Sequence, residues 1–246
     1  MQLAGKTAII TGGGSGIGKA IAAAFVSEGA QVMICGRDRG KLELAASGLG
    51  TGCTPIAADV GDPKDIEHLA SAAAGQFQRI DILVNNAGVL LPGNAESVTD
   101  QQWQQTFDVN VRAVWLLSRA VLPHMRAAGG GSIINIGSVL SFLGARNRVA
   151  YAASKGAVLA MTRAMAVDHA GEKIRVNCIC PGIVETEMVA AFAVGEAARK
   201  QRLALHPMGR FGQPEDVAGL AVFLASDAAS WITGAAYTVD GGYSAV

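Results

Sequence analysis

The sequence predicts an α/β fold in which one open, parallel sheet is covered by helices on both faces. Two observations predict it. Short runs rich in Val and Ile recur along the chain, and most are continuously apolar, which is typical of strands buried on both faces. Segments of helical period separate these runs, and strand–helix alternation over the whole length indicates a parallel sheet. The seven predicted strands are residues 7–11, 31–35, 53–57, 80–84, 132–136, 174–178 and 236–239.

The predicted helices are marked by apolar spacing and by residues that favour helix ends. Apolar residues step by four from Ile17 to Phe25, and Gly29 ends this first helix. Asp62 and Pro63 provide a cap and a first-turn proline for a helix after the third strand. Two further helices begin at the capping-box pair Thr99 and Gln102 and at the polar run 213–216, and another carries Tyr151 and Lys155.

Length and composition exclude several classes of protein. The chain has 246 residues, of which 50% are hydrophobic and 16% are charged, with 20 basic against 20 acidic residues. This balance excludes disorder, which needs low hydrophobicity and high net charge. A pI near 6.9 also argues against a nucleic-acid partner. Because no linker is visible, and the glycines at 129–131 fit a tight helix-to-strand connection, we expect one domain spanning residues 1–246.

The cysteines and the apolar runs predict a cytoplasmic protein with no membrane partner. The four cysteines lie in apolar stretches without the spacing of a disulfide framework or a zinc site, so we expect buried thiols in a reducing compartment. No apolar run reaches the roughly 18 residues that span a bilayer, and the N-terminal residues do not resemble a signal peptide. The histidines are scattered, so we predict no metal site.

A glycine-rich loop joins the first strand to the first helix and predicts a dinucleotide site. The sequence from Thr11 to Gly18 fits Thr-Gly-x-x-x-Gly-x-Gly rather than GxGxxG, and no Gly-Lys-Ser/Thr of a mononucleotide loop follows it. Glycines allow a sharp turn close to a pyrophosphate, and the helix N-terminus offers free N–H groups. We therefore expect a Rossmann-type, doubly wound sheet with a cofactor site that includes Gly12, Ser15, Gly16, Ile17 and Gly18.

The end of the second strand favours NADP(H) over NAD(H). An acidic residue there would bind the ribose 2′-hydroxyl of NAD, whereas this strand ends in Cys35-Gly36-Arg37. Gly36 leaves room, and the planar guanidinium of Arg37 can lie against a 2′-phosphate. NAD(H) remains an alternative, because Arg37 can instead be a solvated residue at a helix start and Asp38 can point back toward the ribose.

Three residues of the second half predict acid–base chemistry. Tyr151 and Lys155 lie four residues apart in a helical segment, so the phenol and the ammonium share one face. A nearby cation favours phenolate, which would lower the high pKa of the tyrosine. Ser138 lies at the end of the fifth strand, where open α/β sheets bind ligands.

Through these motifs, the sequence resembles the short-chain dehydrogenase/reductase family over nearly its whole length. It is most similar to members of the 3-oxoacyl-carrier-protein reductase type and of the sugar or polyol dehydrogenase type. The resemblance rests on residues 11–18, Asp59, 85–88, Asn110, Ser138, Tyr151, Lys155, Pro181-Gly182 with Thr186, and 240–242. It implies hydride transfer between a nicotinamide cofactor and a carbonyl or secondary alcohol, and a homotetramer paired through helices near residues 100–125 and 151–169.

The resemblance also implies a role for each matching residue. Tyr151 would be the general acid or base, Lys155 would lower its pKa and hold the nicotinamide ribose, and Ser138 would donate to the substrate oxygen. Asn110 would anchor a water molecule in the proton relay, with its backbone as the usual contact. The other implied cofactor contacts are Asp59 and Val60 at the adenine, Asn86, Ala87 and Gly88 along the cofactor, and Pro181, Gly182, Ile183 and Thr186 at its nicotinamide half.

Substrate contacts are the least defined part of the site. The stretch 140–148 borders the substrate pocket in the family, so Leu140 and Arg148 join Ser138 and Tyr151 as candidates. Arg148 stands where many relatives have another residue and could bind a substrate carboxylate or phosphate; a surface or interface position is the alternative. Residues 187–211 are expected to form a lid, with His206 on its surface. The rival functions are an NAD-dependent sugar or polyol dehydrogenase and a non-catalytic nucleotide sensor, which would be expected to lack Tyr151 or Lys155.

Overall fold

Seven strands form one parallel sheet in a computed structural model that describes residues 1–190 and 195–245. The strand order is β3-β2-β1-β4-β5-β6-β7, and every paired strand runs parallel to its neighbour. The strands are β1 (Thr7–Thr11), β2 (Gln31–Gly36), β3 (Cys53–Ala57), β4 (Ile82–Asn85), β5 (Gly131–Ile136), β6 (Ile174–Pro181) and β7 (Ala236–Val239). The predicted α/β class is therefore confirmed.

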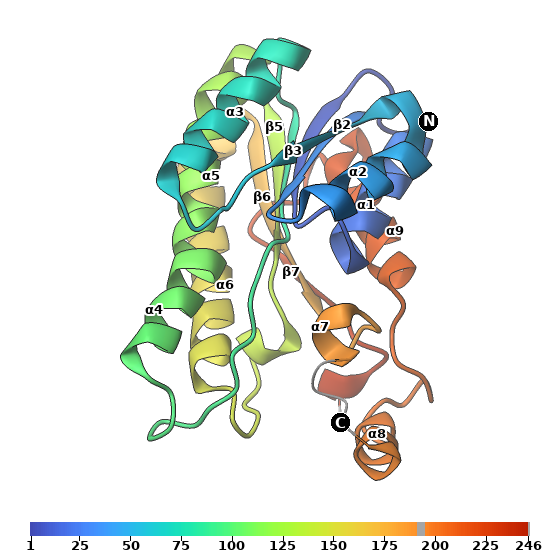
Figure 1. Cartoon of the computed structure of the whole chain (residues 1–246). Coiled ribbons are helices and arrows are strands. Elements are labelled where there is room, and N and C mark those ends of the chain that lie inside the picture. The colour runs from blue at the N-terminus through green and yellow to red at the C-terminus, as the bar shows by residue number, and fades with distance from the viewer. Residues whose placement is uncertain (191–194, 246) are drawn as a thin grey trace.

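Helices cover both faces of the sheet (Figure 1). On one side α1, α2 and α9 pack against the strands, and on the other side α3, α5 and α6 do so. The helices are α1 (Gly16–Ser27), α2 (Arg39–Leu49), α3 (Pro63–Phe77), α4 (Asp100–Phe107), α5 (Ala113–Ala127), α6 (Val149–His169), α7 (Glu187–Ala190), α8 (Glu196–Leu203) and α9 (Pro214–Ala225). The predicted doubly wound arrangement is thus observed.

The observed boundaries differ from the predicted ones at a few positions. The fourth strand begins at Ile82 rather than at residue 80, and β6 extends as far as Pro181. The helix predicted after Thr99 is interrupted by a π-helical segment at Asp108–Arg112, which apolar spacing does not reveal. The expected lid, 187–211, contains α7 and α8; residues 191–194, including Phe192, lie outside the described residues.

Buried polar side chains connect the sheet to the helices on one face. The Asn85 amide donates to the Oδ1 atom of Asn135 (2.8 Å), and the Asn135 amide donates to the Thr162 hydroxyl (2.9 Å). Asn85 also donates to Ser118 of α5 (3.2 Å). Buried amides are stable only with such partners. The chain of bonds therefore fixes α5 and α6 relative to the ends of β4 and β5.

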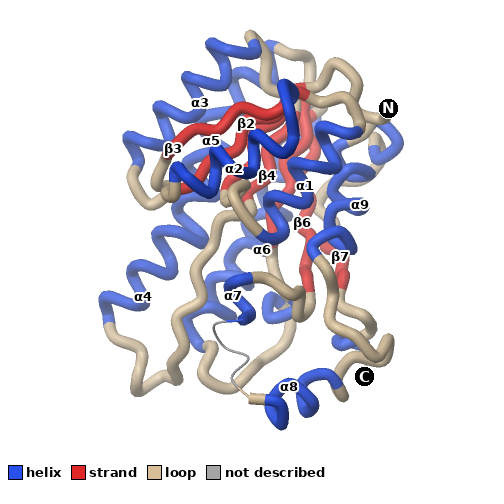
Figure 2. Tube along the Cα trace, turned by 45° about the vertical axis from the view of Figure 1, so that its right-hand side comes forward, coloured by secondary structure: helices blue, strands red, loops and turns tan. Residues whose placement is uncertain are grey.

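The sheet order reverses direction next to β1, and this places the ligand edge. From β1 the chain moves outward to β2 and β3, and then returns to pair β4 with the other side of β1. The loops that follow β1 and β4 therefore diverge, which leaves a crevice at the carboxyl ends of these strands. Figure 2 shows the segments around α7 and α8 extending below this edge of the sheet.

Candidate active site

A cleft of about 460 Å³ lies over the carboxyl edge of the sheet. Its volume falls in the ordinary range of small-molecule sites. Sixteen residues predicted for the site line it: Gly12, Ser15, Gly16, Ile17, Asn86, Ala87, Gly88, Ser138, Leu140, Arg148, Tyr151, Lys155, Pro181, Gly182, Ile183 and Thr186. The fold thus brings together residues from the ends of β1, β4, β5 and β6 that are far apart in the sequence.

The glycine loop forms the end of the cleft that is nearest to α1. Gly12 has a φ of +66°, and a Cβ atom there would lie 2.8 Å from Nδ2 of Asn86. A Cβ atom on Gly18 would overlap the backbone oxygen of Gly12. These contacts let the loop turn closely around the N-terminus of α1, where Ser15, Gly16 and Ile17 face the cleft. The exposed N–H groups of a helix N-terminus are suited to bind phosphate.

Hydrogen bonds from Thr11 hold the next loop in place. The Thr11 hydroxyl accepts from the backbone N–H groups of Asn86 and Ala87, both at 2.9 Å. The Asn86 amide donates in turn to the Thr11 carbonyl (2.8 Å). The ends of β1 and β4 are therefore locked together, and residues 86–88 lie along the cleft as one rigid wall.

Ser138 and Tyr151 meet on the floor of the cleft. Ser138 begins a short 3₁₀ turn after β5, where its hydroxyl accepts from the Leu140 N–H (3.1 Å). Desolvation in the cleft raises the pKa of Tyr151 to about 12, although a hydrogen bond with Ser138 and the charge of Arg148 lower it. This direction is opposite to the expected lowering by Lys155. The reason is that burial of the phenol outweighs the nearby charges.

Lys155 is buried, with 4% of its surface exposed, and its ammonium is fixed by the sheet. The Nζ atom donates to the Ile136 carbonyl at the end of β5 (2.7 Å), and it lies 5.7 Å from the centre of the Tyr151 ring. Desolvation lowers the pKa of Lys155 to about 8, while the neighbouring Cys178 and Cys180 oppose this shift. The group is therefore a cation that burial has made easy to deprotonate.

Asn110 lies beneath the cleft, in the π-helical segment. Its side-chain amide donates to the Val89 carbonyl (2.9 Å) and to the Ser154 hydroxyl (3.0 Å), and its Oδ1 atom accepts from the Val89 N–H (2.8 Å). The side chain is thus used for structure. A Cβ atom on Gly88 would lie 3.3 Å from Oδ1 of Asn110 and 3.6 Å from Nζ of Lys155, so Asn110 and Lys155 are close neighbours.

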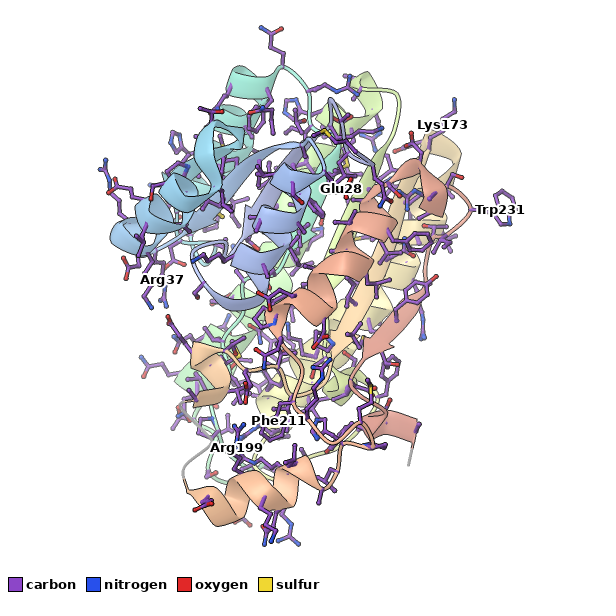
Figure 3. The ribbon with its side chains drawn as sticks, turned by 90° about the vertical axis from the view of Figure 1, so that its right-hand side faces the viewer. Glu28, Arg37, Lys173, Arg199, Phe211 and Trp231 are labelled. Atoms are coloured by element: carbon purple, nitrogen blue, oxygen red, sulfur yellow. The ribbon has the colours of Figure 1, made fainter. Side chains whose placement is uncertain are left out.

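Five predicted residues do not line the cleft: Gly18, Arg37, Asp59, Val60 and Asn110. Gly18 packs under the loop, and Asn110 lies behind the wall formed by Gly88. Arg37 is exposed after β2, where Figure 3 shows it on the outer surface. The Asp59 carboxylate accepts from the Gly61 N–H (2.9 Å) and, like Val60, is half-buried. The Asp38 carboxylate accepts from the Lys41 N–H (3.0 Å) and caps α2.

Several residues that line the cleft were not predicted individually. Glu187, Met188, Arg202 and Leu205 belong to the segment 187–211, which was expected to form a lid, but nothing in the sequence indicates which of its side chains reach the cleft. Tyr243 of the C-terminal turn was not predicted at all, because only the folded chain brings it to the site. The expectation that His206 lies on the surface is wrong: it is 3% exposed, because Phe211 and Tyr243 enclose its ring at centroid distances of 5.3 Å.

Three other features bear on the class of site. In the described part of the chain, none of the helices has both the length and the apolar composition needed to cross a membrane. Within residues 1–190 and 195–245, no group of three His, Cys, Asp or Glu side chains is placed to hold a metal ion. The four cysteines are buried free thiols.

The lowered pKa of Lys155 predicts how stability depends on pH. Below pH 8 the folded and unfolded states both carry this proton, so folding includes the full cost of burying the cation. Between about pH 8 and 10.5 the folded state loses the proton first, and the wild-type protein should gain stability relative to Lys155→Met. Denaturant unfolding of both proteins at pH 7 and pH 9.5 measures this. Lys64→Met, at an exposed position, is the control. If wild type and Lys155→Met differ in free energy of unfolding by the same amount at both pH values, the lowered pKa of Lys155 is contradicted.

Comparison with known proteins identifies the family. A family model described as "Enoyl-(Acyl carrier protein) reductase" matches residues 12–244. The chain is 39% identical to 2-(S)-hydroxypropyl-CoM dehydrogenase 3 of Xanthobacter autotrophicus, over 100% of this chain and 99% of that protein.

Two solved structures share the fold. One is a proposed NAD(P)-dependent gluconate 5-dehydrogenase from Beutenbergia cavernae with bound NADP at low occupancy (43% identity, TM-score 0.94, covering 100% of this chain and 99% of that one). The other is the 3-ketoacyl-(acyl-carrier-protein) reductase of Brucella melitensis complexed with NADH (38% identity, TM-score 0.93, covering 98% and 99%). The chain belongs to the short-chain dehydrogenase/reductase family and is an NAD(P)-dependent oxidoreductase that acts on CH–OH and C=O groups.

Proposed function

We propose that the protein interconverts a ketone and a secondary alcohol with NADP(H), and that Ser138, Tyr151, Lys155 and Asn110 form its catalytic group. The observation that carries the proposal is the floor of the cleft, where a phenol, a hydroxyl and a buried ammonium lie together beside the glycine loop. Acid–base groups next to a dinucleotide site are what carbonyl reduction requires.

The shape of the cleft fits a nicotinamide nucleotide. The tight glycine loop leaves the N-terminus of α1 open, and Thr186 faces Gly16 across the cleft, because a Cβ atom on Gly16 would lie 3.1 Å from Cγ2 of Thr186. Ser15, Gly16 and Ile17 would hold the pyrophosphate with their N–H groups, and Thr186 would bond it from the opposite side. We assign Gly12, Gly18, Asn86, Ala87 and Gly88 to the adjoining wall, Asp59 and Val60 to the adenine, and Pro181, Gly182 and Ile183 to the nicotinamide end.

Proton transfer is assigned to Tyr151. The bound nucleotide supplies or accepts the hydride. Because the pKa of Tyr151 is raised to about 12, the phenol carries its proton at neutral pH and can donate it to a carbonyl oxygen. In the opposite direction the phenolate would accept the proton of the alcohol. The Ser138 hydroxyl would donate to the same oxygen, where negative charge develops during reduction.

Lys155 and Asn110 would support this step from beneath. The Lys155 ammonium has three donors and gives one to the Ile136 carbonyl, so the others would be able to bond the hydroxyls of a nucleotide ribose. Its positive charge would favour the phenolate of Tyr151, in opposition to burial. The Asn110 side chain is engaged with Val89 and Ser154, so we assign a water contact to its backbone in the π-helical segment, a geometry common at functional sites.

NADP(H) is favoured by the end of β2. Arg37 is exposed beside Gly36, and the neighbouring Asp38 carboxylate already caps α2. A guanidinium is a good partner for a 2′-phosphate because it is planar and always charged. The alternative is an NAD-dependent sugar or polyol dehydrogenase, and the NADH in the related reductase of Brucella melitensis supports it.

We further propose how the chain is organised around this reaction. Residues 1–246 would form one dinucleotide-binding and catalytic domain, in which 187–211 act as a substrate lid and Leu140 contacts the substrate. The enzyme would work in the cytoplasm as a homotetramer. Support for pairing comes from large apolar side chains that are exposed on the outer helices: Trp103 of α4 (40%), Trp115 of α5 (46%) and Val167 of α6 (81%).

Tyr151→Phe removes the proposed proton donor and little else. We expect kcat for ketone reduction to fall by about 10²–10⁴, as for loss of a general acid, while NADPH binding stays unchanged. Steady-state kinetics and nucleotide fluorescence measure the two quantities. Tyr237→Phe, in β7 outside the cleft, is the matched control. Turnover that survives Tyr151→Phe would refute the role assigned to Tyr151. A wild-type protein that binds the nucleotide but converts no ketone would favour the non-catalytic nucleotide sensor.

Arg37→Gln tests the preference for the 2′-phosphate. The variant should raise the KM for NADPH by roughly ten- to a hundredfold, the effect of losing a charged hydrogen bond, without changing the KM for NADH. Arg39→Gln is the control, because Arg39 is also exposed but pairs with Glu43 (2.7 Å). A wild-type protein that prefers NADH, or equal effects on the two nucleotides, would favour the NAD-dependent alternative.

A further inference from the structure

Positive charge gathers in the cleft that holds the proposed site. Among its described lining residues, Arg146, Arg148, Lys155 and Arg202 are basic, and Glu187 is acidic. The Glu187 carboxylate is bonded to Lys41 of α2 (2.6 Å), so a cation outside the lining already balances it. The proposed function assigns Lys155 to the nucleotide ribose. The proposed function gives no role to the three arginines of the lining, Arg146, Arg148 and Arg202.

Arg148 is held beside the phenol by its backbone. The residues on both sides of it bond to Gly93, through Gly93 N–H to the Asn147 carbonyl (3.0 Å) and Val149 N–H to the Gly93 carbonyl (3.3 Å). The Arg148 guanidinium donates to the Asn147 carbonyl (2.8 Å) and is close enough to Tyr151 for its charge to lower the pKa of the phenol. Its position next to the reacting group is therefore set by the fold.

Arg202 lines the same cleft but belongs to a later segment of the chain. It lies in the last turn of α8, and the buried ring of His206 is bonded through Nδ1 to its carbonyl (2.9 Å). Earlier in α8, Arg199 donates to Glu185 (2.6 Å). Its guanidinium carbon also lies 4.8 Å from the centre of the Phe211 ring, and Figure 3 labels both Arg199 and Phe211. These contacts anchor α8, so Arg202 is carried on a fixed element rather than on a loose loop.

The two guanidinium groups act on each other. Arg148 and Arg202 both line the cleft that contains Tyr151, and partial burial together with the charge of Arg202 lowers the pKa of Arg148. Arginine keeps its proton at any ordinary pH, so both groups bring positive charge to the cleft. An oxyanion bound between the two guanidinium groups would accept charge-assisted hydrogen bonds from both.

We propose that Arg148 and Arg202 form a clamp for an oxyanion on the substrate, a carboxylate or a phosphate a few bonds away from the reacting carbon. This rests on the proposed function, since it names the substrate class of that same site. The clamp lies beside Tyr151, whereas the glycine loop, Thr186 and Arg37 account for the phosphates of a nucleotide. Substrates are therefore hydroxy acids, keto acids or phosphorylated alcohols rather than neutral sugars or polyols.

Equilibrium binding to the NADP-saturated protein tests the clamp without requiring turnover. The probes are gluconate, glucitol 6-phosphate and glucitol, which share a six-carbon polyol chain, and acetoacetate with its neutral ethyl ester. We expect at least one anion to bind at least ten times more tightly than its neutral analogue in calorimetry. In Arg148→Gln/Arg202→Gln that ratio should fall to near one, while Arg163→Gln, an exposed arginine of α6, should leave it unchanged. Comparing gluconate with glucitol 6-phosphate, each against glucitol, shows whether the clamp prefers a carboxylate or a phosphate.

Several results would overturn the clamp. These are equal binding of anionic and neutral probes in both sets, an anion preference that survives the double variant, or a double variant that loses affinity for NADP rather than for the anions. Failure of the proposed function looks different, because the anions would then bind through the arginines with no conversion by the wild-type protein. The single variants Arg148→Gln and Arg202→Gln keep the test available if the double variant does not fold; each should lower the ratio.

Discussion

The bond from the Lys155 ammonium to the Ile136 carbonyl is the interaction on which the rest of the site depends. It crosses from α6 to the end of β5, where Lys155 is buried and an unpaired ammonium would be very costly. Two neighbouring bonds extend it: the Ser141 hydroxyl donates to the Lys155 carbonyl (2.9 Å), and the Asn110 amide donates to Ser154 (3.0 Å). Because the start of α6 is held from both sides, Tyr151 has little freedom to leave Ser138.

The sheet topology and the glycine loop impose the second constraint. The reversal of strand order beside β1 creates the crevice, and Thr11 bonds the ends of β1 and β4 so that its walls cannot spread. The proposed acid–base group and the proposed nucleotide wall are therefore parts of one rigid edge. The proposed substrate clamp comes from other segments: Arg148 follows β5 and Arg202 belongs to α8, so the substrate end of the cleft could change without altering the floor.

The parts of the structure that sequence predicts well are those with local physical signatures. Continuous apolar runs predicted all seven strands, and capping residues such as Asp62 and the pair Thr99 and Gln102 mark real helix starts. The π-helical segment around Asn110 has no such signature, because Phe107 and Val111 keep the four-residue spacing of an ordinary α-helix across it. Arg202, Tyr243 and the burial of His206 depend on contacts between distant segments, and the raised pKa of Tyr151 depends on desolvation that only the folded cleft provides.

Hydride transfer itself is the central claim, and isotope labelling tests it most directly. The protein is incubated with NADPH that carries deuterium at the transferable position of the nicotinamide, together with a panel of ketones, keto esters, keto sugars and keto acids. Mass spectrometry of the alcohols then locates the label. The proposed reaction predicts one deuterium on the carbinol carbon of at least one product, and a rate of labelling at least about a hundredfold lower when Lys155→Met or Tyr151→Phe replaces the wild-type protein. Binding of the nucleotide without transfer of label to any member of the panel, from NADPH or from labelled NADH, would contradict it.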